Sequence, residues 1–166
     1  MPDIRPSGRM RQYRSNAYTL SYPDNWQAFG DQGAPTVTIA PRDALFQGGN
    51  SNGVQIGYGA MISYYMPEGD RIDLQQHTAD LIRQLQQSNG AMSVQNRRTI
   101  RVDGQNALIT TLTSQSPYQG EREIDALVTV ARPQGLFYLV FIAPQSEWRD
   151  AESVFDQMLR TIQFEP

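Results

Sequence analysis

Residues 136–164 read LFYLVFIAPQSEWRDAESVFDQMLRTIQF and decide the fold. Every residue of Leu136–Ala143 is apolar, which predicts a central strand that is covered on both faces. Ser146 follows as a candidate N-cap, and apolar residues then recur at helical spacing, at Trp148, Ala151, Phe155, Met158, Leu159 and Ile162. Burying this stripe contributes on the order of 10 kcal/mol before opposing terms. The segment therefore predicts a buried strand, an amphipathic helix and a short closing strand.

The residues before this segment predict hairpins. Asp103-Gly104 separates Arg98–Val102 from Ala107–Thr113, and Asp-Gly between two β-rich runs favours a type I′ turn because both turn residues need positive φ. A second hairpin is expected across Ser114–Glu123, so that Glu123–Arg132 pairs next and leads into the central strand. The second half of the chain thus predicts an antiparallel meander.

The first half predicts three more strands, Ala17–Tyr22, Thr36–Ala40 and one long strand over Val54–Tyr65. Trp26 follows a Pro-Asp-Asn turn and should fill one end of the core. Gly57 and Gly59 indicate a bulge or close packing against another backbone.

Between the two halves, Asp73 is the candidate N-cap of a helix, with Gln76 at the position that a capping box requires. Asn89-Gly90 supplies the C-terminal stop. Because strands dominate and do not alternate strictly with helices, we expect an α+β fold: an antiparallel β-sheet of about six to eight strands with helices packed on it.

Three stretches together resemble a known fold: YTLSYPDNW at 18–26, IRVDGQNALITTL at 100–112, and the closing segment. The pattern resembles the PsbP-like fold shared with Ran-binding Mog-type proteins, an α/β/α sandwich, over Ala17–Phe164. More narrowly, it resembles the accessory domain that follows the catalytic domain in some bacterial zinc metallopeptidases of the HExxH class. The chain itself lacks HExxH, so no peptidase residue is carried over.

Composition excludes several kinds of chemistry. The 166 residues suit one domain. All 14 basic residues are arginine, and there is no lysine or cysteine, which rules out Schiff-base lysines, thiol nucleophiles and Cys-ligated zinc within the chain. His77 is the only histidine, so a two-histidine metal site is impossible. No cofactor is expected.

Charge and hydropathy bear on partners. The net charge of −3 gives no support for nucleic-acid binding, and no apolar run is long enough to span a membrane. Residues 1–16 hold four arginines against one aspartate, a local +3, and are expected to be a linker or tail before a single domain over residues 17–166. The resemblance implies an extracytoplasmic compartment, and a partner that is either a preceding domain of the same chain or another protein.

Two polar clusters are candidate sites. His77 has Asp73 and Asp80 at helical neighbour positions and could bind a metal, but an exposed helical histidine beside solvated acids is the favoured interpretation. The carboxylates at 121, 123 and 125 (Glu121, Glu123 and Asp125) alternate along a strand and could serve acid–base catalysis, although a polar outer face is the commoner cause.

Residues 47–53 (QGGNSNG) predict a flexible loop. Gly48 and Gly49 match no phosphate-loop spacing and no lysine follows them. With Tyr64, Tyr65 and Tyr118 they form the candidate interaction surface, where Tyr118 in the turn SPYQG is the best candidate for an exposed aromatic.

These observations favour a non-catalytic accessory or interaction domain, C-terminal to the catalytic domain of a bacterial zinc metallopeptidase. The alternative is a stand-alone extracytoplasmic module that binds a small molecule or lipid in a cleft under residues 47–53. A third hypothesis, an enzyme that uses carboxylates and His77, is the least favoured.

Overall fold

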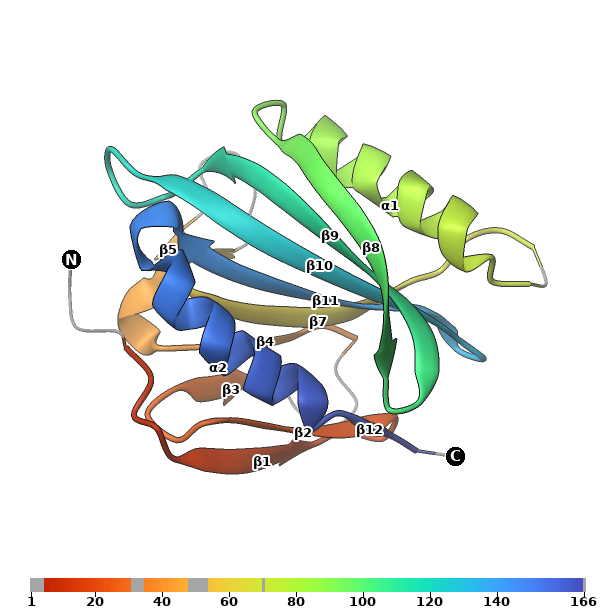
Figure 1. Ribbon diagram of the computed structural model, residues 1–166, viewed down its shortest axis with the longest axis horizontal. Coiled ribbons are helices and arrows are strands. Elements are labelled where there is room, and N and C mark those ends of the chain that lie inside the picture. The colour runs from red at the N-terminus through yellow and green to blue at the C-terminus, as the bar shows by residue number, and fades with distance from the viewer. Residues whose placement is uncertain (1–4, 31–34, 48–53, 70, 166) are drawn as a thin grey trace.

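The computed structural model describes residues 5–30, 35–47, 54–69 and 71–165 (Figure 1). Its strands are β1 Met10–Arg14, β2 Tyr18–Pro23, β3 Gln27–Phe29, β4 Val37–Ala40, β5 Leu45–Gln47, β6 Val54–Ile56, β7 Gly59–Tyr65, β8 Ser93–Val102, β9 Gln105–Gln115, β10 Arg122–Arg132, β11 Gly135–Pro144 and β12 Gln163–Phe164. Its α-helices are α1 Leu74–Ser88 and α2 Trp148–Arg160, and 3₁₀ turns precede β5 at Arg42–Ala44 and α2 at Gln145–Glu147. Among the described residues, neither α-helix is long and apolar enough to cross a membrane.

The main sheet has seven antiparallel strands in the order β3-β4-β7-β11-β10-β9-β8. β11 lies in the middle, between β7 and β10, which confirms the predicted central strand. A three-stranded sheet, β1-β2-β12, and a short pair, β5-β6, accompany it.

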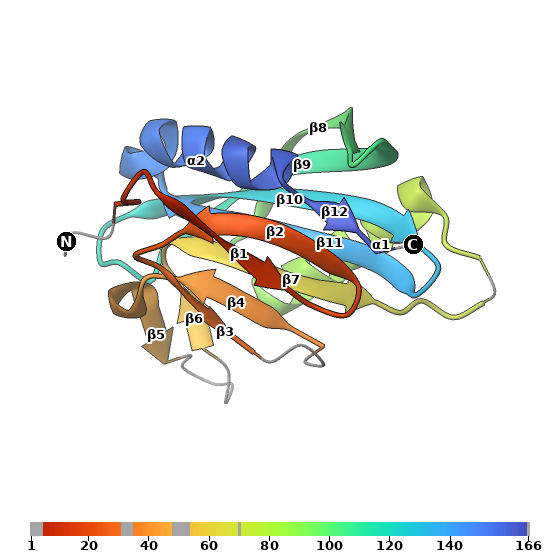
Figure 2. The ribbon, with the colours of Figure 1, turned by 90° about the horizontal axis from the view of Figure 1, so that it is seen from below.

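The two helices pack on opposite faces of the seven-stranded sheet (Figure 2). On one face, Leu81 and Ile82 of α1 pack with Leu127, Leu136 and Val140. On the other face, α2 and the β1-β2-β12 sheet cover the odd-numbered side chains of β11, Phe137, Leu139 and Phe141. The predicted α+β fold, an antiparallel sheet with helices packed on it, is therefore confirmed.

The Asp-Gly hairpin also forms as predicted. Asp103 and Gly104 have φ values of 50° and 73°, and Val102 pairs with Gln105 across the turn. These are the positive φ values that a two-residue type I′ turn requires, so the turn fixes the register of β8 on β9.

The single long strand expected over Val54–Tyr65 is wrong. β6 pairs with β5, whereas β7 pairs with β4 and β11, and the chain bends between them. Glycine is required at the start of β7, because the φ of Gly59 is +147° and a Cβ there would lie 2.6 Å from the Ile39 carbonyl oxygen. The expected close approach to another backbone is confirmed, and Gly59 begins β7 directly after the bend at Gly57 and Tyr58.

The linker or tail expected over residues 1–16 needs a similar correction. Met10–Arg14 is a strand that pairs antiparallel with β2, and the Asp24 amide donates to the Arg9 carbonyl at 2.8 Å. Tyr13 is buried in the core. The arginines at 9, 11 and 14 suggest a solvated tail, but pairing with β2 makes a strand of this segment and buries Tyr13 within it.

Candidate functional site

A trough runs along α2, on the face of the sheet that α2 covers only in part. Helix α2 packs on β11 and β2, and beyond it β8 and β9 extend with no helix over them on this face. Two adjoining hollows of about 100 and about 320 Å³ lie there and share Arg98, Ile109, Asp156 and Leu159. We call this feature the α2 trough.

The floor of the α2 trough is a row of side chains across three neighbouring strands. Thr111 of β9 and Phe141 of β11 are the cross-strand partners of Ala126 on β10. A methyl group stands between two larger side chains, so the floor dips at Ala126. Phe141 stacks on Phe155 of α2, with ring centroids 4.6 Å apart, and this contact closes the inner side of the trough.

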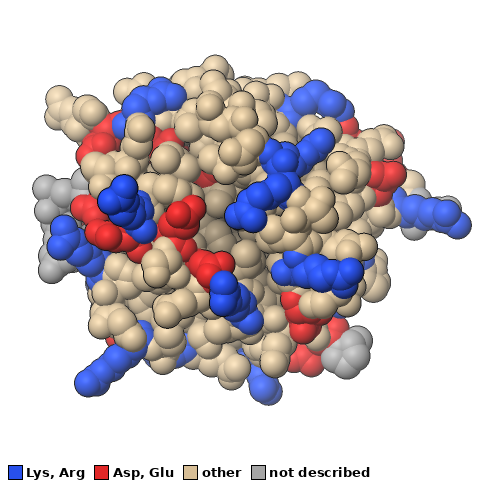
Figure 3. Space-filling model, in the orientation of Figure 1, with Lys and Arg blue, Asp and Glu red and all other residues tan. Residues whose placement is uncertain are grey.

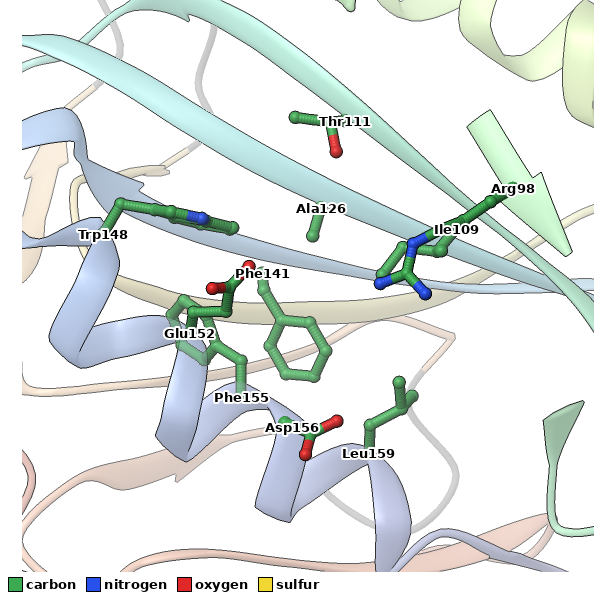
Figure 4. A pocket seen from close by; sticks show the side chains of 10 residues that line it. All are labelled: Arg98, Ile109, Thr111, Ala126, Phe141, Trp148, Glu152, Phe155, Asp156 and Leu159. Atoms are coloured by element: carbon green, nitrogen blue, oxygen red, sulfur yellow. The ribbon is translucent and has the colours of Figure 1, made fainter. Parts of the chain in front are cut away.

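The walls of the α2 trough carry opposite charges. Arg98 reaches over the floor from β8, while Glu152 and Asp156 line the α2 side (Figure 4). Basic and acidic side chains accordingly face each other across a central hollow of the surface (Figure 3). Asp156 already pairs with Arg160 at 3.0 Å, but neither Arg98 nor Glu152 takes part in an ion pair within the described part of the chain.

The trough combines apolar and polar groups that are open to solvent. Ile109 and Thr111 on the floor are half-buried, as are Trp148 and Leu159 on the α2 wall. The sequence predicted Trp148 and Leu159 as core residues from their spacing, and it gave no reason to group them with Ile109. Only the position of α2 over the sheet brings them together.

The acidic cluster lies elsewhere and differs from its prediction. Glu123 and Asp125 are 7% and 3% exposed, so the expected polar outer face is wrong for both. They project from β10 on the α1 face, on the same side of the strand as Leu127. Glu121 belongs to the turn before β10 and accepts a hydrogen bond from Ser146 Oγ at 2.7 Å.

Burial changes the chemistry of this carboxyl pair. Burial raises the pKa of Glu123, and its interactions with Asp125 and Ser114 offset part of that rise. The pKa of Asp125 is raised well above its ordinary value by burial and by the neighbouring Glu123. Asp125 Oδ1 has no hydrogen-bond partner among the described residues. Two acids in one buried site favour retention of a proton over a double negative charge.

Ser146 was expected to cap α2, and this prediction is wrong. A 3₁₀ turn at Gln145–Glu147 precedes the helix, whose N-cap Glu147 makes no side-chain capping bond. The Ser146 hydroxyl instead joins the helix entry to Glu121.

His77 is buried, in contrast to the exposed helical histidine that the sequence favoured. The Asp73 amide donates to His77 Nδ1 at 2.8 Å, and the Gln76 amide donates to the Asp73 carboxylate at 2.8 Å. His77 therefore completes the cap that the sequence assigned to Asp73 and Gln76. Asp80 pairs with Arg83. Within the described residues no group of three or more His, Asp or Glu side chains is placed to hold a metal.

The tyrosines chosen from the sequence do not share a surface. Tyr118 packs edge-on against Phe46, with ring centroids 4.9 Å apart, and its buried hydroxyl has no partner among the described residues. Burial raises the pKa of Tyr118, and the expectation of an exposed aromatic is wrong. Tyr64 and Tyr65 belong to the clusters on opposite faces of β7. Gly48 and Gly49 lie outside the described residues.

Comparison with known proteins identifies the fold through structural similarity. No protein-family model matches the sequence, and no curated protein is similar to it in sequence. Cyanobacterial PsbP from Synechocystis sp. PCC 6803 superposes with a TM-score of 0.67 at 12% identity, over 99% of both chains. The Ran-binding protein MOG1P of Saccharomyces cerevisiae superposes with a TM-score of 0.55 at 10% identity, over 93% of this chain and 95% of the other.

A third similar structure is LpqN, which is involved in cell envelope biogenesis of Mycobacterium tuberculosis. It superposes with a TM-score of 0.52 at 12% identity, over 95% of this chain and 91% of LpqN. These structures match nearly the whole chain at low sequence identity. They therefore show a shared course of the backbone and give no information about the side chains of a site. The chain has the PsbP-like fold, the architecture of cyanobacterial PsbP and of yeast MOG1P.

Proposed function

We propose that this chain is a non-catalytic interaction module that holds an apolar segment of a protein partner in the α2 trough. The proposal is carried by one observation: Ile109, Trp148 and Leu159 stay half-exposed around a dipped floor, between walls of opposite charge. Interfaces bury aromatic and aliphatic groups at their centre and place charges at the rim, and the trough offers both.

Catalysis is the weaker proposal because the candidate groups are apart. His77 precedes Thr78, whose hydroxyl bonds that of Thr129 at 2.7 Å. Along β10, Asp125 lies four residues before Thr129, which is a distance of about 13 Å in a strand. His77 and Asp125 are therefore not placed to act together. His77 Nδ1 is also engaged by the Asp73 amide. A purified chain is expected to hydrolyse none of a broad panel of peptide and ester substrates.

We also propose that the module serves as an accessory domain beside the catalytic domain of an extracytoplasmic zinc metallopeptidase. The support is the sequence resemblance over Ala17–Phe164. The open reading frame that encodes this chain tests it directly. We expect the reading frame to encode a secretion signal followed by an HExxH domain upstream of this chain. A reading frame that lacks both would overturn the accessory assignment and would leave the trough proposal intact.

Selection of ligands tests the trough. A phage-displayed library of random 16-residue peptides is panned on the immobilised chain, and enriched peptides are titrated calorimetrically against wild type and Ile109→Asn. We expect the affinity to fall about tenfold in Ile109→Asn, the loss that accompanies about 1.4 kcal/mol. Val94→Asn is the matched control, because Val94 is a 46% exposed β-branched residue outside the trough.

Equal binding to both variants would refute the proposal. Native mass spectrometry of the purified chain tests the other occupant of an apolar hollow, a small molecule or lipid. A bound mass that disappears in Ile109→Asn would replace the peptide proposal by a carrier function.

A further inference from the structure

The outer edge of β8 is the longest open strand edge of the main sheet. β8 is the last strand in the order of the seven-stranded sheet, and the opposite edge strand, β3, has only three residues. Residues 93–99 and Arg101 are exposed. The sheet therefore ends in a strand of ten residues that neither helix shields.

The hairpin register tells which backbone groups point outward. In a two-residue hairpin the residues that flank the turn, here Val102 and Gln105, form a pair that exchanges both backbone hydrogen bonds. Alternation then directs the amides and carbonyls of Arg97, Thr99 and Arg101 away from β9. No backbone hydrogen bond from another part of the described chain reaches these three residues.

The same edge is strongly basic. β8 reads SVQNRRTIRV, so it carries three arginines and no acid. None of the ion pairs formed by described residues includes Arg97, Arg98 or Arg101. Their cross-strand partners on β9 are Thr110, Ile109 and Asn106, which are uncharged.

This charge decides between possible occupants of the edge. A second copy of the chain, paired antiparallel about Thr99, would place Arg97 directly opposite Arg101, and like charges directly opposite are destabilising. An acidic strand in the same place would pair with both arginines. The edge therefore repels itself and attracts an acidic partner.

We propose that the outer edge of β8 accepts an extended acidic segment of a partner protein as an eighth strand of the main sheet. Main-chain hydrogen bonds to Arg97, Thr99 and Arg101 would hold the segment, as in other cases of strand addition. Ile100 packs toward the core on the α2 face, so alternation along β8 directs the side chain of Arg97 to the other face. Arg101 lies beside the hairpin turn, where its guanidinium donates to the Gly104 carbonyl at 3.4 Å and it also lines the outer hollow of the trough. The segment that fits alternates acidic and apolar residues. This proposal concerns the strand edge and does not require that the α2 trough be occupied.

A synthetic probe tests the proposal: a capped nine-residue peptide in which glutamate alternates with valine, titrated into the whole chain. Amide hydrogen exchange is expected to slow at Arg97, Thr99 and Arg101 when the peptide binds. The same peptide with lysine in place of glutamate should bind at least about tenfold more weakly. Equal affinity for the two peptides, or no slowing at these amides, would refute the proposal.

Two changes separate strand addition from simple charge attraction. Thr99→Pro removes one outward donor without breaking a β8–β9 bond, and it should weaken binding about tenfold. If this variant fails to fold, a peptide N-methylated at alternate amides blocks the same bonds from the other side. Undiminished binding of the N-methylated peptide would show that charge alone is responsible, and strand addition would be wrong.

Ile109→Asn keeps this result distinct from the trough proposal. The glutamate–valine peptide should bind this variant within about twofold of wild type, because Ile109 lies on the trough floor and not on the edge. A loss of binding in Ile109→Asn with unchanged binding in Thr99→Pro would place the peptide in the trough and overturn the edge proposal.

Discussion

The two faces of β9 and β10 are packed to different degrees. On the α1 face, Leu112 and Leu127 are fully buried, and even the carboxyl groups of Glu123 and Asp125 are excluded from water. On the α2 face, Ile109 and Thr111 of the same hairpin remain half-exposed. The physical reason is helix placement: a helix is about 10 Å across and covers only the strands directly beneath it, and α1 lies over β9 and β10 whereas α2 lies over β11 and β2.

The difference indicates which face is available for binding. Helix α1 packs over β9, β10 and β11, whereas α2 shares its face with the β1-β2-β12 sheet and lies over β11. Buried side chains on both faces contribute stability, whereas Ile109 and Thr111, which α2 leaves half-exposed, contribute less and offer surface. Substitutions on the two faces should therefore separate effects on stability from effects on binding.

The largest expected effect is on the closed face. Leu127→Ala should lower the free energy of unfolding by about 2–5 kcal/mol, because it removes a fully buried side chain from a site that cannot collapse. Ile109→Ala, one register step away on β9 and half-buried, should cost less than about 1 kcal/mol. Urea denaturation of both variants measures the contrast, and similar losses would mean that the two faces are equally packed.

The second expected effect concerns the buried carboxyl pair. Raised pKa values mean that the folded chain keeps protons that the unfolded chain releases, so this pair makes stability fall as the pH rises from about 4 toward the raised values. Asp125→Asn should lose less stability than wild type between pH 5 and pH 8, by on the order of 1–3 kcal/mol.

Thermal unfolding across this pH range measures the difference between wild type and Asp125→Asn. Glu68→Gln, which changes an exposed carboxyl, is the control and should follow the wild-type profile. Parallel profiles for wild type and Asp125→Asn would contradict the assignment of the pair as the source.

A smaller effect is expected where α1 is attached to the sheet. Thr129→Val leaves the buried Thr78 hydroxyl without its partner and should cost about 1–2 kcal/mol. The double variant Thr78→Val, Thr129→Val removes both hydroxyls and should recover most of that loss. Chemical denaturation measures the free energy of unfolding of both variants. A double variant that is no more stable than the single one would contradict this account, because the loss would then not come from an unpaired buried hydroxyl.

The smallest expected effect is on the wall of the α2 trough. Arg98→Ala should change the free energy of unfolding by less than about 0.5 kcal/mol, because Arg98 is exposed and joins no ion pair among the described residues. Arg98→Ala should also lower the binding affinity of trough-selected peptides whose acidic residues face β8. A large loss of stability would indicate that the trough is part of the core.

Local sequence rules succeeded where short-range chemistry is decisive. The Asp103-Gly104 turn, the Asp73 cap and the central strand at Leu136–Ala143 follow from turn propensity, capping and apolar runs, and each depends on residues near one another in the chain. The expected helix of residues 148–160 formed for the same reason, although Ser146 bonds to Glu121 and not to the helix start.

The failures involve contacts between distant segments. Alternating acids at 123 and 125 look like a solvated face, and only the packing of β10 between β9 and β11 buries them. The stretch 54–65 is divided because β6 pairs with β5 whereas β7 pairs with β4, twenty positions earlier, and with β11. The composition of Met10–Arg14 suggests a tail, and the segment is a strand only because it pairs with β2.

By itself, the sequence of residues 136–164 determined a buried central strand and the helix that packs on it, because an apolar run and a 3.6-residue period leave few alternatives. The sequence of residues 93–102 likewise determined that this segment carries three arginines and no acid. The tertiary structure alone decided that α2 lies over β11 and leaves the trough open beside it, since helix placement depends on which distant strands share the same face. For the same reason, only the fold turned the basic residues 97–101 into an open strand edge.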